Sequence, residues 1–331
     1  MLTGCLNQPI WFCNAELHFA YWRSPRPPAA SFAWQKLVSG RKPTNVGQKP
    51  ATKQEFSLAR SFKTLLSLPG PDEEKTDRQF ITALARGLEV LRAFEPGDGF
   101  LGNLEIAQRT GLPKPTVARI AHTLTTLGYL EYNARLEKYS LGTPVLSLGY
   151  AYLGSMSLTR VARPHMQELA NHANISVALG NRDRLNLAYL ELAHGSATVS
   201  LRLEVGARIP IARSAMGMAY LHALPESERD FLVEAIEKHD KADFPKFKKR
   251  LATAFKELDA HGYCVSLGTY ERTVNGVGAA LKTRDGGVYA FNCSGPSFHL
   301  TEEMIRSDVG PRLAVMVSRI EAELLVHPVR V

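Results

Sequence analysis

The stretch between residues 80 and 142 carries the pattern that most constrains the fold of this chain. Apolar residues recur every three or four positions over 80–94, 104–109 and 114–127, which predicts three amphipathic helices. Gly111 stands between the second and the third, and glycine suits the left-handed conformation that ends a helix. Short segments at 129–132 and 138–141 then predict a β-hairpin. This order of elements is that of a winged helix-turn-helix.

The third helix has the side chains expected of a helix that lies in the major groove of DNA. Its predicted apolar stripe includes Val117, Ile120 and Leu127. Arginine binds guanine through two hydrogen bonds, and lysine or threonine reaches bases or phosphates. Residues 77–145 hold 8 basic and 7 acidic residues, so an ordinary solvated helical surface stays an alternative. The candidate DNA-binding residues are Lys114, Thr116, Arg119 and His122 on the helix, and Arg135 and Lys138 on the hairpin.

The remaining sequence predicts linker helices over 143–173 and a second domain over 174–327, which makes the whole chain α+β. Leu148 and Tyr152 lie along one side of the first linker helix, which suggests that it also dimerises. Beyond residue 174, strands are predicted at 175–179, 185–192, 199–203, 277–281 and 288–293. Helices are predicted near 214–223, 226–238, 244–261 and 301–324. This mixture indicates an α/β sensor domain with an antiparallel sheet.

Residues 1–76 differ in composition from the rest of the chain. They contain all three tryptophans and 8 of the 19 prolines, without a sustained helical or strand period. They also hold 10 of the 40 Lys and Arg residues against 5 of the 32 Asp and Glu residues. This composition predicts a disordered tail or a wrongly chosen start codon, and a basic arm that helps hold DNA is the alternative.

Composition and cysteine spacing also bear on location. The four cysteines form no CxxC pair, no apolar run is long enough for a membrane span, and the first residues lack the order of a secretory signal. We therefore expect a cytoplasmic protein with reduced thiols that needs no metal, no cofactor and no membrane.

Several motifs resemble the IclR family of transcription regulators. They include EIAQRTGLPKPTVARIAHTLTTLGYLE, ARPHMQELA, GARIPIARSAMGMAYLHALPESE, HGYCVS, NGVGAAL and NCSGP, spread over about residues 80–325. The resemblance implies a winged helix-turn-helix, a linker helix and a C-terminal ligand domain similar to the GAF fold. It also implies homodimers or homotetramers on palindromic operator DNA, and small organic-acid or aromatic effectors.

The resemblance places the effector in a cup between the sheet, a Ser/Thr-Ala-x-Gly loop and the strand after a Gly-Tyr pair. The loop here is Ser214, Ala215, Met216 and Gly217, and a helix starting at Ser214 would aim N–H groups at a carboxylate. The alternative is a capped helix with Met216 in the core. The acidic residue and the cysteine that many family members carry nearby are missing. The further candidates are Cys264, Asn275, Gly276 and Cys293, and for each cysteine the alternative is a small buried apolar residue. Arg202 and Arg213 are candidate partners of a carboxylate, with simply exposed arginines as the alternative.

These observations predict a sequence-specific, DNA-binding transcription regulator, a repressor or an activator, controlled by a small effector. Two other classes stay open. One is a ligand sensor that acts through a protein partner. The other is an enzyme that uses Cys264 or Cys293 with a histidine, although the sequence has no dinucleotide-binding, Walker or HExxH motif and no catalytic residue is predicted.

Overall fold

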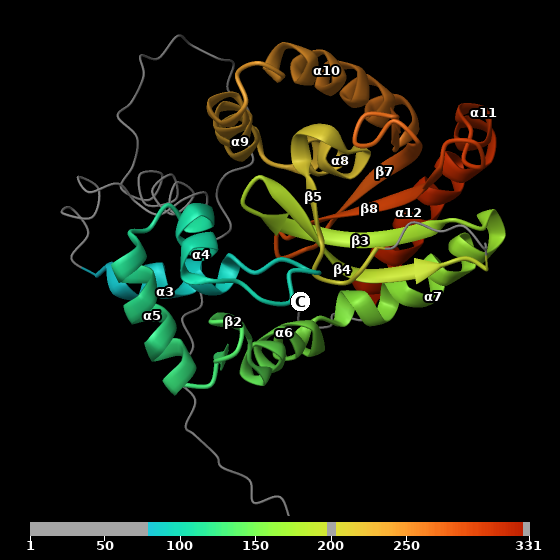
Figure 1. Ribbon diagram of the computed structural model, residues 1–331. Helices are drawn as coiled ribbons and strands as arrows, with labels where there is room; N and C mark the ends of the chain where they lie inside the picture. The colour runs from blue at the N-terminus through green and yellow to red at the C-terminus, as the bar shows by residue number, and fades with distance from the viewer. Residues whose placement is uncertain (1–78, 197–202, 327–331) are drawn as a thin grey trace, which may run out of the picture. The chain divides into compact units, whose positions relative to one another are not determined.

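The computed structural model describes residues 79–196 and 203–326 (Figure 1). The N-terminal segment 1–76, Arg202 and all but the last residue of the strand predicted at 199–203 lie outside these described residues. Within the described ranges, no helix combines the length and the apolar character that crossing a bilayer requires.

The N-terminal part is a winged helix-turn-helix, as the pattern predicted. It contains α3 (Thr82–Arg92), α4 (Asn103–Thr110), α5 (Lys114–Thr126), β1 (Leu130–Asn133) and β2 (Lys138–Leu141). Gly111 ends α4 in the left-handed conformation, with φ of +70°, so the chain turns sharply into α5. Strands β1 and β2 pair antiparallel, with Leu130 opposite Leu141. One small core holds the elements together: Val90, Phe94, Leu101, Ile106, Val117, Ala121 and Leu130.

Two helices follow the hairpin and differ in burial. Helix α6 (Thr143–Ser155) has no buried residue, although it is largely apolar. Helix α7 (Ser157–Ala173) begins after an extended residue at Met156 and continues through Pro164. Its apolar stripe is buried, and this stripe includes Leu158, Met166 and Ala170. The first linker helix therefore leaves its apolar side chains in solvent, whereas the second belongs to the core of the next domain.

The C-terminal domain is built on one antiparallel sheet of six strands in the order β5-β4-β3-β8-β7-β6. Two short edge strands, β5 and β6, were not predicted from periodicity, because three or four residues are too few to show alternation. Strand β6 does follow Gly262 and Tyr263, where the family resemblance placed a strand. The strands are β3 (Ser176–Asp183), β4 (Asn186–His194), β5 (Arg208–Pro210), β6 (Cys264–Leu267), β7 (Val274–Lys282) and β8 (Val288–Pro296).

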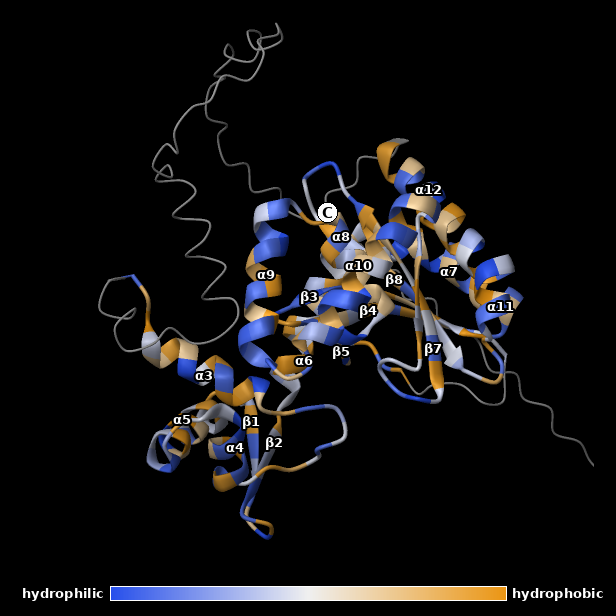
Figure 2. Cartoon of the chain, turned by 90° about the horizontal axis from the view of Figure 1, so that it is seen from above, coloured by the Kyte–Doolittle hydropathy of each residue, from blue (hydrophilic) through white to orange (hydrophobic). Residues whose placement is uncertain are grey.

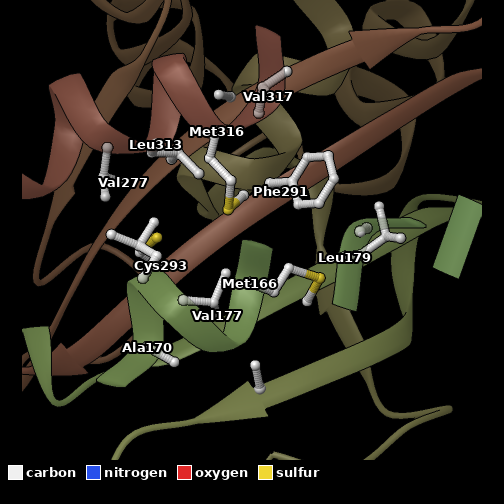
Figure 3. Packing of buried hydrophobic residues seen from close by; sticks show 14 of the residues in the cluster. Met166, Ala170, Val177, Leu179, Val277, Phe291, Cys293, Leu313, Met316 and Val317 are labelled. Carbon is white, nitrogen blue, oxygen red and sulfur yellow. The ribbon is translucent and has the colours of Figure 1, made fainter. Parts of the chain in front are cut away.

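Helices cover both faces of the sheet (Figures 1 and 2). On one face lie α8 (Ala215–Ala223), α9 (Glu226–His239) and α10 (Phe244–His261). On the other face α7 packs beside α12 (Gly310–Val326). Figure 3 shows this second core, where Met166 of α7, Phe291 and Cys293 of β8, and Met316 of α12 meet. The α+β class predicted from the sequence is thus the observed one.

The C-terminal helix predicted at 301–324 is interrupted. It consists of α11 (Glu302–Met304), a π-helical turn (Ile305–Val309) and α12. Pro311 has no N–H to donate to the carbonyl oxygen of Ser307, so the regular hydrogen-bond ladder cannot run through this point. Periodicity did not reveal the interruption because Ile305, Val309 and Leu313 are spaced by four residues and all remain buried.

Candidate functional sites

Helix α5 presents a polar face that is anchored by a buried one. Val117 and Ala121 are fully buried against the small N-terminal core, which fixes the rotation of the helix about its axis. Lys114, Arg119 and His122 are exposed, and Thr116 is half-buried. Neither Lys114 nor Arg119 forms an ion pair within the described parts of the chain. Both cations are therefore available to an anionic partner such as a DNA backbone or a base edge.

The hairpin presents its two predicted cations differently. The Oδ1 atom of Asn133 accepts the N–H groups of Arg135 and Leu136, both at 3.1 Å, and this shapes the tip that exposes Arg135. Lys138 instead pairs with Glu105 of α4, with Nζ 3.0 Å from Oε2. The N–H of Gly102 and then this ammonium group hold the pKa of Glu105 below its usual range, so the acid stays charged. Arg135 is thus the better placed of the two for a phosphate.

Helices α3 and α6 expose apolar side chains, and those of α3 belong to the apolar face that the sequence pattern predicted. Ile81, Leu84 and Leu88 are 64%, 60% and 51% exposed along one side of α3. A groove of about 830 Å³ lies between α3 and α5, and Leu148 of α6 also lines it. Thr116, Arg119 and His122 line its α5 side. We call the exposed residues Ile81, Leu84, Leu88, Leu127, Leu148 and Tyr152 the α3/α6 apolar face.

In the second domain, Ser214 is the N-terminal cap of α8, and the first residues of α8, up to Gly217, lie in close contact with their neighbours. The Ser214 hydroxyl accepts the N–H of Gly217 at 3.0 Å and donates to the carbonyl oxygen of Pro210 at 2.9 Å. A side chain on Gly217 would collide with the backbone of Ile211, and one on Gly278 of β7 would collide with Ala215. Ala215 and Met216 are buried. These contacts agree with the alternative of a capped helix with Met216 in the core.

A row of small residues, one glycine and three serines, crosses the sheet on the α8 side. Gly276 is in register with Ser266 of β6 and with Ser294 of β8, and Ser294 is in register with Ser176 of β3. Because Val277 and Cys293 face the α7 and α12 core, their neighbours Gly276 and Ser294 face the α8 side. The hydroxyl of Ser294 is buried without a hydrogen-bond partner in the described residues. Such a group costs free energy unless something not present in the free chain satisfies it.

Of three further predicted effector residues, Asn275 and Cys293 face away from the α8 side of the sheet, whereas Cys264 lies on that side. Asn275 lies on the opposite face of the sheet from Gly276, donating to the carbonyl oxygen of Leu300 at 2.9 Å and accepting the N–H of Gly268 at 3.2 Å. Cys293 is enclosed in the α7 and α12 core (Figure 3). Cys264 donates to the carbonyl oxygen of Ala215 at 3.3 Å. Burial raises the pKa of both thiols well above the usual range, so neither is a ready nucleophile.

An open pocket of about 330 Å³ lies where α10 passes the start of α8 and the edge strand β6. Ser214 is the one predicted effector residue among its lining residues, together with Arg213, which the sequence offered as a carboxylate partner. Met218, Ala254 and Val265 supply apolar surface, and Ser266, Thr253 and Thr269 supply hydroxyls. Lys246, Lys249 and Arg250 of α10 complete the lining. Sequence analysis missed these three, because a basic run in an amphipathic helix is usually solvated surface.

The fold and these sites define a class: a DNA-binding transcription regulator with a separate ligand-binding domain. Two family models match the chain, the IclR helix-turn-helix domain over residues 83–134 and the bacterial transcriptional regulator IclR C-terminal domain over residues 150–321. The chain belongs to the IclR family of transcription regulators, which confirms the family resemblance and the regulatory function inferred from the sequence.

Individual relatives agree with the family models. The chain is 34% identical over 258 residues to the HTH-type transcriptional regulator TsaQ1/TsaQ2 of Comamonas testosteroni, covering 77% of this chain and 92% of that protein. It is 45% identical to an IclR family transcriptional regulator from Brucella abortus, with a TM-score of 0.72, covering 78% of this chain and 98% of the other. An IclR homologue of Microbacterium hydrocarbonoxydans, solved with 4-hydroxybenzoate, shares the fold at 21% identity and a TM-score of 0.57, covering 74% and 100% of the two chains.

Proposed function

We propose that two copies of this chain place their α5 helices in successive major grooves of a pseudo-palindromic operator, with Lys114, Thr116 and Arg119 toward the DNA. The observation that carries the proposal is the exposed polar face of α5, whose cations are unpaired within the described chain while its other face is locked into a core. A helix held in this way can enter the major groove, which admits an α-helix. The protein would then act in the cytoplasm, as a repressor or an activator.

The direct test is a gel-shift titration of the full chain on the DNA that flanks its own gene. We expect this DNA to be selected over random duplex by a factor of about 10³ or more, as specific regulators achieve. Binding to both duplexes with the same affinity would contradict the proposal. A sensor that acts only through a protein partner would show no selective binding to either.

The partner that best fits the α3/α6 apolar face is a second copy of the chain. A two-fold interface is self-complementary, so the same surface on both protomers is covered at once. The face adjoins the helix-turn-helix, where pairing would fix the separation of two α5 helices on a palindrome. Large exposed apolar surfaces of this kind mark interaction sites in soluble proteins. We therefore propose a homodimer through this face, or a homotetramer that contains such dimers.

Replacing Leu148 by glutamate should dissociate this dimer. The side chain is 58% exposed in the single chain, so the substitution leaves the fold intact but places a charge in the apolar contact. We expect the molecular mass in sedimentation velocity to fall toward that of the next smaller species, with a loss of operator affinity. Phe298→Glu is the control, because Phe298 is 76% exposed in the turn after β8. An unchanged mass for Leu148→Glu would place the dimer interface elsewhere.

The wing makes a separate prediction about salt dependence. Arg135→Ala should weaken binding to all duplexes alike and lower the slope of log K against log salt concentration by about 1, as the loss of one phosphate contact does. Lys138→Ala should change the slope less, because Glu105 already neutralises that ammonium group. Equal slope changes for the two variants would show that Glu105 releases Lys138 on DNA.

We further propose that a small organic acid bound in the pocket between α8 and α10 controls operator occupancy. The basic lining supports an acidic ligand, and the relative from Microbacterium was solved with an aromatic acid. A ligand shifts DNA binding only if its affinity differs between the DNA-competent and the incompetent conformations. The gel-shift titration, repeated with a panel of organic acids, tests this step: at least one acid should change operator affinity, and no response across the panel would count against it.

A further inference from the structure

The charge balance of the α8/α10 pocket restricts the ligand more than its size does. Four cationic side chains line the pocket, Arg213, Lys246, Lys249 and Arg250, and no acidic one does. Two acids contact lining residues: Asp243, whose Oδ2 atom lies 2.8 Å from Nη2 of Arg250, and Glu257, which accepts the N–H of Val265 at 2.9 Å but is paired with Arg306. The guanidinium of Arg250, ahead of other nearby charges, holds the pKa of Asp243 below its usual range, so the acid is ionised. One negative charge thus faces four positive ones, and the pocket keeps an excess of positive charge.

Two of these cations are held in place rather than free in solvent. Nη2 of Arg213 points to the carbonyl oxygens of Thr269 and Tyr270, each at 3.4 Å, in the loop after β6. Nη2 of Arg250 donates to the carbonyl oxygen of Ala212 at 3.2 Å as well as to Asp243. Lys246 is 78% exposed and its Nζ atom lies 3.8 Å from Oδ1 of Asp243, so that acid offsets part of its charge. The remaining cations come from two elements: Arg213 precedes α8, and Lys249 and Arg250 lie on α10.

We infer that the effector of this pocket is a small dianion, with one acidic group held by Arg213 and the start of α8, and the other by Lys249 and Arg250. This inference rests on the proposal that the pocket is the effector site. The N-terminus of α8 adds the partial positive charge of the helix dipole beside Arg213, although the N–H of Gly217 is already capped by the Ser214 hydroxyl. A ligand with one acidic group would leave part of the positive charge of this lining uncompensated.

The apolar part of the lining indicates what joins the two acidic groups. Met218, Ala254 and Val265 add hydrocarbon surface to the same lining. A pocket of about 330 Å³ is at the small end of ligand sites. A short dicarboxylate with an aliphatic or aromatic middle matches both features, because its carbon atoms contact the floor while its ends reach the guanidinium and ammonium groups.

The test is isothermal titration of the full chain with matched pairs of acids: terephthalate against 4-methylbenzoate, and adipate against hexanoate. Within a pair the carbon frame is similar and only the second charge differs. We expect at least one dicarboxylate to bind about tenfold or more tightly than its monoanionic partner, because charge-assisted contacts are the strong ones. In Arg213→Gln and in Lys249→Gln, this preference should fall to about threefold or less. Lys256→Gln, an exposed lysine on the same helix outside the pocket lining, is the matched control and should keep the full preference.

Two results would overturn the inference: equal or tighter binding of the monoanions, or no binding of any dicarboxylate in the panel. The same would follow if Lys256→Gln reduced the preference as much as Lys249→Gln, because the effect would then be one of net charge. Gel shifts on the same samples separate this from the proposed function. Tight monoanion binding that changes operator affinity would contradict the dianionic ligand and agree with the proposed operator binding. Dicarboxylate binding without operator selection would agree with the dianionic ligand and contradict the proposed operator binding.

Discussion

Replacing Arg119 by alanine is expected to reduce operator affinity by about 1–3 kcal/mol for each half-site, if the side chain reads a base. Arg119 is exposed on α5, opposite the buried Val117 and Ala121, so its removal should not disturb the fold. A dimer on a palindrome loses the contact twice. Base preference should relax at the two symmetry-related positions that the guanidinium contacts, and affinity for random duplex should fall far less.

The measurement is a competition gel shift with operators changed at one base pair at a time, in both the parent protein and the variant. Arg284→Ala is the matched control, because Arg284 is an exposed arginine in the turn between β7 and β8 of the other domain. The control should bind the operator like the parent protein. A variant at Arg119 with unchanged affinity and unchanged base preference would exclude this residue from base recognition and would leave Lys114 and Thr116 as candidates.

The second large effect is expected for Gly217→Ala, which should destabilise the C-terminal domain by about 3 kcal/mol, at the upper end of overpacking effects. A Cβ atom at this position would lie 2.1 Å from the carbonyl oxygen and 2.5 Å from the Cα atom of Ile211. Both are backbone atoms, so a side-chain rotation cannot relieve the contact. The start of α8 must then move off the 3-10 turn at Ile211–Arg213. The midpoint of thermal unfolding should fall by on the order of 10 °C.

Gly154→Ala is the matched control for this substitution. Gly154 lies in α6 without a positive φ, and a Cβ atom at this position would have nothing within 4 Å of it. Alanine there restricts the unfolded chain and favours the helix, so stability should stay constant or rise by up to about 1 kcal/mol. Calorimetry of both variants and of the parent protein gives the midpoints of thermal unfolding to be compared. Equal midpoints for Gly217→Ala and the parent protein would mean that the close contact between α8 and Ile211 is absent in solution.

The DNA-binding half was predicted almost completely because its information is local. Helices α3, α4 and α5 follow from apolar spacing, and Gly111 marks the turn through its left-handed backbone. The pattern left one aspect open. The spacing of Ile81, Leu84 and Leu88 predicts an apolar side of α3, and all three are exposed in the single chain. Periodicity identifies a face that avoids water, but it does not say whether the same chain or another covers it.

The proposed effector pocket was predicted less well because its parts come from distant segments. Sequence reasoning found Ser214 and Arg213 at the start of α8, where a local helix signal exists. It also selected Asn275 and Cys293, which the alternation of strands β7 and β8 turns to the opposite face of the sheet from Gly276. Lys249 and Arg250 gave no signal of their own. They line the pocket only because α10 folds across α8 and β6, about 35 residues after Ser214.

The amino-acid order alone therefore determined the helices, the winged helix-turn-helix and the family, because each depends on residues close in the chain or on motifs that stand unbroken in it. Tertiary structure decided which cations stay unpaired, which face of the sheet each strand residue takes, and which side chains gather around the pocket. These properties depend on how segments more than 30 residues apart pack together. Strand register and helix packing set that arrangement, and neither can be obtained from spacing within one segment.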